Sequence, residues 1–284
     1  MITKHLRILI VATTLPFIQP LSAELPMLEP PWLGDFAVAN ESSFRFILTK
    51  NGDFKILVLN KNRDPIESYP IALQFLATEV LPDGSKRDLT MNWNTVESSD
   101  PANAKMKKTV LRSKLTEQAT GQPTLEITIE VSGGTLLANA RITDKGSLAK
   151  NLARPVIRMG FKDFYGEENA QKATWDKKQI RDFDKLISKD FVRLKHLDGK
   201  TIKLACVEKT NLKPNEINGG GSSLAEVEIS AYQNKTIEFL ADPDSSLTLD
   251  NAGAAPLHNG FRFEWSSDTA KDLDGKAKLA IRIK

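Results

Sequence analysis

The polar stretch "KDFYGEENAQKA", residues 162 to 173, carries side chains that could hold a sugar. Tyr165 offers a flat ring within it, and Trp175 follows just after it. Flat rings stack against the C–H faces of a pyranose, while charged groups bind its hydroxyls. Arg158, on the segment before the stretch, could point toward the same region. These residues predict a carbohydrate ligand, although both rings could instead pin a neighbouring helix to the rest of the fold.

Histidine chemistry has few candidates, because the chain holds three histidines. His5 lies in the N-terminal leader described below, and His196 stands beside a turn, where an exposed position at a strand end is expected. His258 lies in the small-residue loop "AAPLHNGFRFEW" and is the fourth predicted ligand-binding residue. Two remaining histidines without a spacing motif argue against a catalytic zinc site, so we predict neither a metal nor a cofactor.

Three consecutive glycines, Gly219 to Gly221, raise the question of a phosphate loop. Such a loop needs a following lysine and a helix whose N-terminus points at the phosphate. No lysine follows directly, and residues 224 to 231 alternate as a strand does. The glycines therefore predict a connection between strands.

Acidic residues cluster in "SDTAKDLDGKAK", where Asp272 and Asp274 precede Gly275. An EF-hand calcium loop needs a glutamate at its twelfth position, and counting Asp272 as the third puts Ile281 there. Asp and Gly also favour turns for backbone reasons, so a turn is the preferred interpretation and calcium stays open. The paired carboxylates of a glycosidase stay open too, because sequence spacing does not give the distance across a fold.

The elements that must position these residues are strands, because apolar and polar residues alternate through most of the chain. In "TLEITIEV", from residue 124, Leu125 and Ile127 face one way while Glu126 and Thr128 face the other. About fifteen such segments follow one another, with turn signals at the spacing typical of sandwiches. The predicted fold is all-β, an antiparallel β-sandwich or supersandwich with one short helical insertion.

Three hairpins have loops whose length follows from this alternation. Directly opposed residues of an antiparallel pair share a face, so Leu48 should oppose Phe54. The same test on two further hairpins sets three pairs: Phe75 with Met91, Leu73 with Trp93, and Leu194 with Ile202. Each loop then has three residues and a left-handed glycine that forms a bulge. These glycines are Gly52, Gly84 and Gly199.

One segment has a different period. Residues 174 to 188, "TWDKKQIRDFDKLIS", place apolar side chains three or four apart, which predicts an amphipathic helix with Thr174 as its N-cap. This helix divides the strands into two groups, so the chain is either two packed sandwiches or one continuous supersandwich. The predicted organisation is a signal peptide (1–23), an extended proline-rich arm (24–42), a β-sandwich region (43–162), a loop and helix (163–189), and a second β-sandwich region (190–284).

The N-terminus predicts export. Lys4 and Arg7 precede a short apolar run, and the small pair Ser22-Ala23 ends it, which is the order of a secretory signal peptide. The run is too short and too interrupted to span a bilayer, which needs about 20 apolar residues. We therefore predict a secreted or periplasmic protein that begins at Glu24 and has no membrane span.

Charge and cysteine content exclude other classes. Loss of the leader removes two of the 39 Lys and Arg and none of the 36 Asp and Glu, which leaves a net charge of +1. Nucleic-acid-binding proteins concentrate positive charge on one face, whereas the longest basic cluster here is "KMKK" at 105 to 108, so nucleic acid is not an expected partner. Cys206 is the only cysteine, so no internal disulfide can form, and its alternation with Ile202 and Leu204 predicts a buried strand position.

Residues 124 to 161, "TLEITIEVSGGTLLANARITDKGSLAKNLARPVIRMGF", give an alternating strand, a glycine turn, a second strand, a polar loop and an outgoing strand. This order resembles the galactose-mutarotase-like supersandwich proteins, which bind or act on carbohydrates. The resemblance implies their fold and a sugar ligand. Enzymes of that family carry a histidine close to the end of the outgoing strand, where this chain has Met159, Gly160 and Phe161. The resemblance therefore does not extend to epimerase chemistry.

Three functions follow from the sequence. The first is an exported non-catalytic protein that binds carbohydrate or assists polysaccharide processing. The second is an envelope protein in which strand edges and the N-terminal arm contact a protein partner. The third is a glycan-active enzyme whose carboxylates cannot be paired from sequence. An exposed aromatic ring beside an acidic cleft would favour a glycan function, and a flat apolar patch would favour a protein partner.

Overall fold

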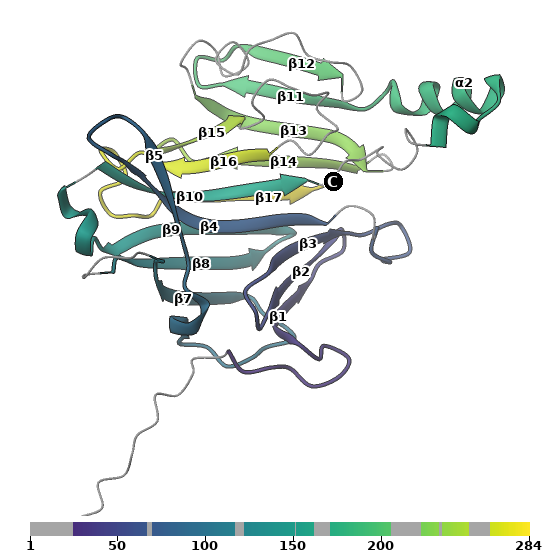
Figure 1. The fold of residues 1–284 in the computed structure, drawn as a ribbon. Helices are drawn as coiled ribbons and strands as arrows, with labels where there is room; N and C mark the ends of the chain where they lie inside the picture. Colours follow the sequence, from purple (N-terminus) through teal and green to yellow (C-terminus); the bar gives the residue numbers. More distant parts are fainter. Residues whose placement is uncertain are drawn as a thin grey trace, which may run out of the picture.

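The computed structural model describes residues 25–66, 70–116, 122–150, 152–161, 171–205, 223–232, 235–249 and 262–284. Those residues form seventeen strands and one α-helix, with three short 3₁₀ turns (Figure 1). The strands pair antiparallel and lie side by side in two long rows. The prediction of an all-β fold with one short helix is confirmed.

The first row contains strands from both ends of the chain. In spatial order it runs through β1 (Asp35–Asn40), β2 (Phe44–Thr49), β3 (Phe54–Val58), β4 (Ile71–Val80), β10 (Leu152–Phe161), β16 (Arg262–Ser267) and β15 (Ser245–Leu249). A short strand, β5 (Lys86–Thr90), pairs with the second half of β4.

The second row begins in the middle of the chain. It runs through β6 (Glu97–Ser98), β7 (Lys108–Lys114), β8 (Thr124–Ser132), β9 (Thr135–Asp144), β17 (Leu279–Ile283), β14 (Lys235–Ala241), β13 (Leu224–Tyr232), β11 (Phe191–His196) and β12 (Thr201–Ala205). The two rows meet where Leu224 pairs with Leu247. The pairs β10–β16 and β9–β17 join strands that precede the helix to strands that follow it.

One apolar core fills the space between the rows. Phe239 of β14 contacts Phe161 of β10 and Phe263 of β16, with ring centroids 5.7 and 6.3 Å apart. Trp265, two residues after Phe263 on β16, is completely buried. Burial of one such side chain contributes about 1.5–3 kcal/mol, so the inward residues of each strand hold the two layers together.

The hairpin predictions are largely confirmed. Gly52, Gly84 and Gly199 have φ angles of +91°, +82° and +87°, the left-handed conformation expected of three-residue loops. Leu48 pairs with Phe54, and Leu194 pairs with Ile202.

The predicted pair of Leu73 with Trp93 is wrong, because β5 ends at Thr90. The next residues leave the strand: Met91 bridges to Leu115, and the Asn92 side chain accepts a hydrogen bond from the backbone of Asn94. Trp93 therefore starts a 3₁₀ turn, η1 (Trp93–Thr95). The pair of Phe75 with Met91 lies one step beyond the last paired residues and is likewise not formed.

Two further expectations are wrong at named residues. Thr174 belongs to a short turn, η3 (Lys172–Thr174), and the helix α2 (Lys177–Ile187) is capped by Asp176, whose side chain accepts from the backbone of Gln179. His196 is 1% exposed rather than exposed, because the alternation of β11 places it on the inward face.

The N-terminal arm contributes one strand to the sandwich. Residues 35 to 40 form β1, and Phe36 to Ala39 are buried. The preceding residues from Leu25 on lie against this strand, where the backbone of Leu28 donates to Asp35. Among the helices that the structure describes, none is long and apolar enough to cross a membrane.

Candidate functional site

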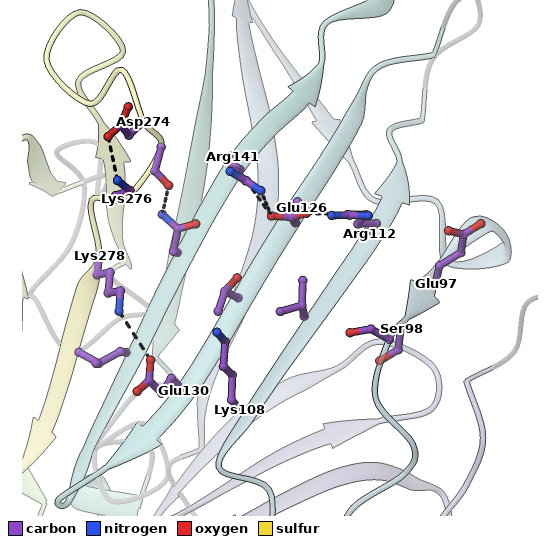
Figure 2. A pocket seen from close by; sticks show the side chains of 16 residues that line it. Glu97, Ser98, Lys108, Arg112, Glu126, Glu130, Arg141, Asp274, Lys276 and Lys278 are labelled. Carbon is purple, nitrogen blue, oxygen red and sulfur yellow. Dashed lines mark hydrogen bonds and ion pairs between the residues drawn. The ribbon is translucent and has the colours of Figure 1, made fainter.

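A groove of about 660 Å³ lies on the outer face of the second row of strands (Figure 2). Its floor is formed by β7, β8 and β9, and its two sides by the segment of β6 and by residues 274 to 278 before β17. The floor residues point outward because Leu111, Ile127 and Ala138 take the inward positions of the same strands. The alternation that builds the core therefore also builds the groove.

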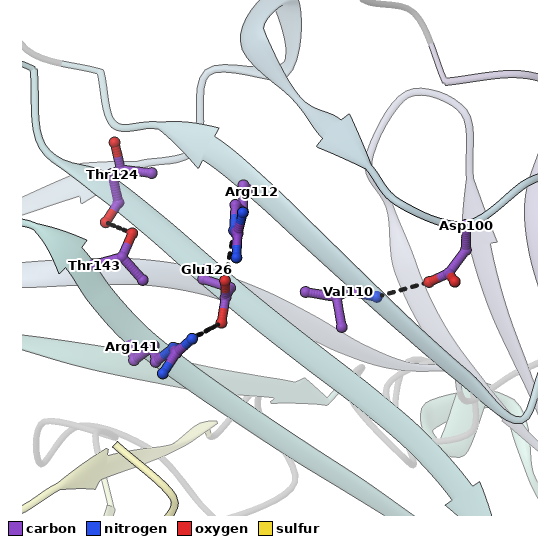
Figure 3. Close-up of polar contacts among 7 residues, drawn as sticks. All are labelled: Asp100, Val110, Arg112, Thr124, Glu126, Arg141 and Thr143. Atoms are coloured by element: carbon purple, nitrogen blue, oxygen red, sulfur yellow. Dashed lines mark hydrogen bonds and ion pairs between the residues drawn. The ribbon is translucent and has the colours of Figure 1, made fainter. Parts of the chain in front are cut away.

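A row of charged side chains crosses the groove at one end. Arg112, Glu126 and Arg141 are direct cross-strand partners on β7, β8 and β9. Arg112 donates through Nε to Glu126 Oε2 at 2.5 Å, and Arg141 donates through Nε to Oε1 at 2.6 Å (Figure 3). Nη2 of Arg141 lies 2.6 Å from the same Oε1. One carboxylate thus holds two guanidinium groups.

The protonation state of Glu126 is set by these contacts. Its residue is 5% exposed, and this burial alone would raise the pKa of the carboxyl group. The hydrogen bonds from Arg112 and Arg141 and their positive charges outweigh that effect and hold the pKa below its ordinary value. Glu126 is therefore ionised at neutral pH and cannot serve as a proton donor there.

Two further ion pairs line the other side. Lys278 lies 3.6 Å from Glu130, and Lys276 lies 2.8 Å from Asp274. Dashed lines mark both pairs in Figure 2. All four side chains are substantially exposed, so each pair contributes little to stability. They make this side of the groove polar but neutral.

The loop before β17 is fixed to the groove floor by Asn139. Its side-chain amide donates to the backbone oxygens of Gly275 and Ala277, at 3.1 and 2.6 Å. Gly275 has a φ of +62°, and a Cβ atom there would lie 3.2 Å from the Arg141 side chain. Asn139 and Gly275 thereby hold the loop closely against Arg141.

The acidic segment of that loop behaves as a turn. Asp272 Oδ1 accepts from the backbone nitrogens of Lys276 and Ala277, at 2.6 and 3.1 Å. In the described residues, no cluster of three or more His, Cys, Asp or Glu side chains is arranged to hold a metal ion. The interpretation of these aspartates as turn residues agrees with this geometry.

Arg158 lies elsewhere, on the outer face of the first row. Its guanidinium contacts Glu264 of β16 and Asp88 of β5, with Nε–Oε1 and Nη2–Oδ2 distances of 2.7 Å each. These hydrogen bonds connect β10 to β16 and β5. A role in ligand binding stays a prediction.

Of the remaining predicted ligand residues, Trp175 alone belongs to the described part of the chain, and it does not line the groove. The ring of Trp175 packs edge-on against Phe183 of α2, with centroids 5.1 Å apart. Its role in ligand binding stays a prediction. Tyr165 and His258 lie outside the described residues, as do Cys206 and Gly219 to Gly221. Their predicted roles stay predictions.

Sequence reasoning missed the Arg112–Glu126–Arg141 row. One signal was present: a hairpin around Gly133 that pairs Ser132 with Thr135 also opposes Glu126 to Arg141. An outward glutamate opposite an outward arginine is a pattern that alternation alone could have revealed. The place of β17 beside β9 has no such signal.

Comparisons with known proteins inform the fold. No protein-family model matches the sequence, and no curated protein does. Among solved structures, the α-N-acetylgalactosaminidase NagBb from Bifidobacterium bifidum matches in its Gal-NHAc-DNJ complex with a TM-score of 0.54 at 12% identity, over 87% of this chain and 36% of that one. Its ligand-free structure matches with a TM-score of 0.50 at 10% identity, over 87% of this chain and 35% of that one. This chain thus spans about a third of that enzyme.

A galactose mutarotase-related enzyme from Lactobacillus acidophilus also matches, with a TM-score of 0.43 at 9% identity, over 88% of this chain and 97% of that one. The resemblance expected from residues 124 to 161 is consistent with the β-sandwich fold that this chain shares with the NagBb structures. At such low identity the α-N-acetylgalactosaminidase structures show a shared fold. The chain is an antiparallel β-sandwich of the kind found in that enzyme.

Proposed function

We propose that this protein is an exported, non-catalytic β-sandwich protein that binds carbohydrate in the groove over β7, β8 and β9. The observation that carries the proposal is the row of Arg112, Glu126 and Arg141 across a groove of about 660 Å³. Guanidinium and carboxylate groups are the polar anchors that fix a hydroxyl-rich ligand. The fold shared with a carbohydrate-active enzyme supports the same class of ligand.

The state of Glu126 favours binding over hydrolysis. A glycosidase needs one carboxyl group with a raised pKa to protonate the leaving oxygen. Both arginines keep the pKa of Glu126 low, so this buried carboxylate does not fit that role. The other acidic groups of the lining are all at least partly exposed: Glu130 and Asp274 are ion-paired with lysines, and Glu97 lies at the edge on β6.

A bulky substitution in the groove floor tests the location. Thr128 stands outward between Val110 and Asn139, so Thr128→Trp should fill the groove without changing its charge. The matched control is Thr248→Trp, which faces outward on β15 in the other row. On a glycan array, we expect the chain from Glu24 and the Thr248 variant to bind and the Thr128 variant to lose binding. Equal melting temperatures would show that both variants fold.

Two array results would contradict the proposal. Binding by the Thr128 variant at the level of the unmodified chain would place the glycan elsewhere. The absence of any bound glycan would remove the proposed function.

Export has its own test. Mass spectrometry of the protein recovered from the periplasm or medium of an expressing bacterium should give a chain that begins at Glu24, with neither disulfide nor lipid. Exported protein that retains Met1 would contradict the signal peptide.

A further inference from the structure

We infer that the sugar bound in this groove is acidic, and that its carboxylate or sulfate group binds between Arg112 and Arg141. The inference rests on the proposed function and narrows its ligand to one chemical class. It follows from the free donors of the two arginines, from the local charge, and from the types of side chain that the groove lacks.

The two arginines keep donors available. Arg112 uses Nε for Glu126, and Arg141 uses Nε and Nη2. Within the described part of the chain, Glu126 is the only acceptor or ion-pair partner of either guanidinium. Their side chains are 60% and 43% exposed, against 6% for Glu126. The remaining N–H groups therefore face the groove, where a planar or tetrahedral oxyanion can accept two of them at once.

The carboxylate fixes both arginines without neutralising them. Glu126 supplies one negative charge to two guanidinium groups, so this cluster retains one positive charge. The pairs Lys278–Glu130 and Lys276–Asp274 are neutral, and the remaining charged lining residues are Lys108 and Glu97. Glu97 lies opposite Arg112 on β6 but is not within ion-pair distance of a described cation. The charged residues that line the groove are thus five cations and four carboxylates, so the groove as a whole carries one surplus positive charge.

The composition of the groove disfavours a neutral sugar. Flat aromatic rings stack on the C–H faces of a neutral sugar, and none of the sixteen described residues that line this groove is aromatic. The apolar lining consists of Val110 and Leu137. Recognition must then come from charged and polar groups, of which pre-positioned arginines are the strongest for carboxylate and sulfate.

The test compares matched charged and uncharged probes by calorimetry. Trigalacturonate is paired with its methyl ester, and a sulfated galactan trisaccharide with its desulfated form. We expect at least one acidic probe to bind and its uncharged partner to bind about tenfold more weakly or not at all. Arg112→Gln with Arg141→Gln should lower the affinity for the acidic probe by about 10- to 100-fold, because two charge-assisted contacts are lost. The acidic pair that shows this difference identifies carboxylate or sulfate as the ligand group.

The control variant removes the same charge far from the groove. Arg181→Gln with Lys185→Gln changes two exposed residues of α2 and should leave affinity unchanged. If uncharged probes bind equally well and the arginine variant keeps its affinity, the acidic-sugar inference is overturned while the proposed function stands. If no glycan binds to the protein at all, both are overturned.

Discussion

The two outer faces of the sandwich carry arginine–carboxylate clusters of opposite composition. On the groove face, Glu126 holds Arg112 and Arg141. On the opposite row, Arg158 holds Asp88 and Glu264. The first cluster has one buried carboxylate and two exposed guanidinium groups, whereas the second has one guanidinium that is 16% exposed between two carboxylates. The same chemical groups therefore leave a positive surface on one face and an occupied arginine on the other.

The difference shows why residue type alone does not identify a ligand site. Burial lowers the tendency of Arg158 to stay charged, but its hydrogen bonds to Asp88 and Glu264 prevail and raise its pKa. Through these hydrogen bonds, the Arg158 guanidinium connects β10 to β5 and β16. Arg112 and Arg141 have the same donors, but they share one acceptor and open onto a groove. The two clusters differ in their central group, which is the carboxylate of Glu126 on the groove face and the guanidinium of Arg158 on the opposite face.

The largest effect is expected from removal of the central arginine. Arg158→Ala removes the guanidinium that both Asp88 and Glu264 contact, which should lower the free energy of unfolding by about 2–3 kcal/mol. Arg154→Ala is the control, since this residue lies on the same strand and forms no ion pair with the described residues. Thermal denaturation should show the loss for Arg158 alone. Equal melting temperatures for the two variants would mean that the cluster is not structural.

Removal of the Glu126 carboxylate should lower the free energy of unfolding by less than removal of Arg158 does. Glu126→Ala frees two arginines that are exposed enough to be hydrated, so we expect a loss of about 1–2 kcal/mol. Glycan affinity should fall as well, because both guanidinium groups lose their fixed orientation. Urea denaturation and calorimetry measure the two effects separately. Intact affinity would show that Glu126 does not position the arginines.

The ionised carboxylate of Glu126 should also make the stability of the protein depend on pH in the acidic range. Burial would raise the pKa of Glu126, but its arginine hydrogen bonds lower it on balance, so the folded pKa lies below the unfolded one. The stabilisation is therefore fully present above the unfolded value of about 4.3 and is lost as the pH falls through the folded pKa. Glu126→Gln should lose less stability than the unmodified chain between neutral pH and that acidic range. An identical pH profile would contradict the lowered pKa.

Gly275 tests how closely the loop before β17 controls Arg141. Gly275→Ala combines a positive φ with a Cβ that would approach the Arg141 side chain, so we expect a loss of about 1 kcal/mol together with weaker glycan binding. Gly84→Ala is the matched control, because Gly84 has a φ of +82° and open space around it. Both variants should be destabilised, and only the Gly275 variant should bind less. Equal affinities would separate the loop from the site.

The sequence predicts much of the fold but not the groove. Alternation sets each strand's inward face and the hairpin register, because both depend on neighbouring residues; Leu48 and Phe54 are an example. It fails at Trp93, where the Asn92 side chain forms a local turn that the alternation does not encode. The groove needs β17 beside β9, and Asn139 reaches backbone atoms 136 and 138 residues away. Such long-range pairing has no signal in a single sequence.

The smallest expected effect concerns Glu97, which opposes Arg112 on the strand at the edge of the groove. It is exposed, so Glu97→Gln should leave stability within about 0.5 kcal/mol of the unmodified chain. The change removes a negative charge near the proposed oxyanion and should raise the affinity for an acidic sugar by about two- to threefold, with a smaller gain at high salt. The uncharged partner of that sugar should bind as before. If calorimetry instead showed weaker binding of the acidic probe, Glu97 would be a direct hydrogen-bonding partner of the sugar, and the anion would not lie beside Arg112.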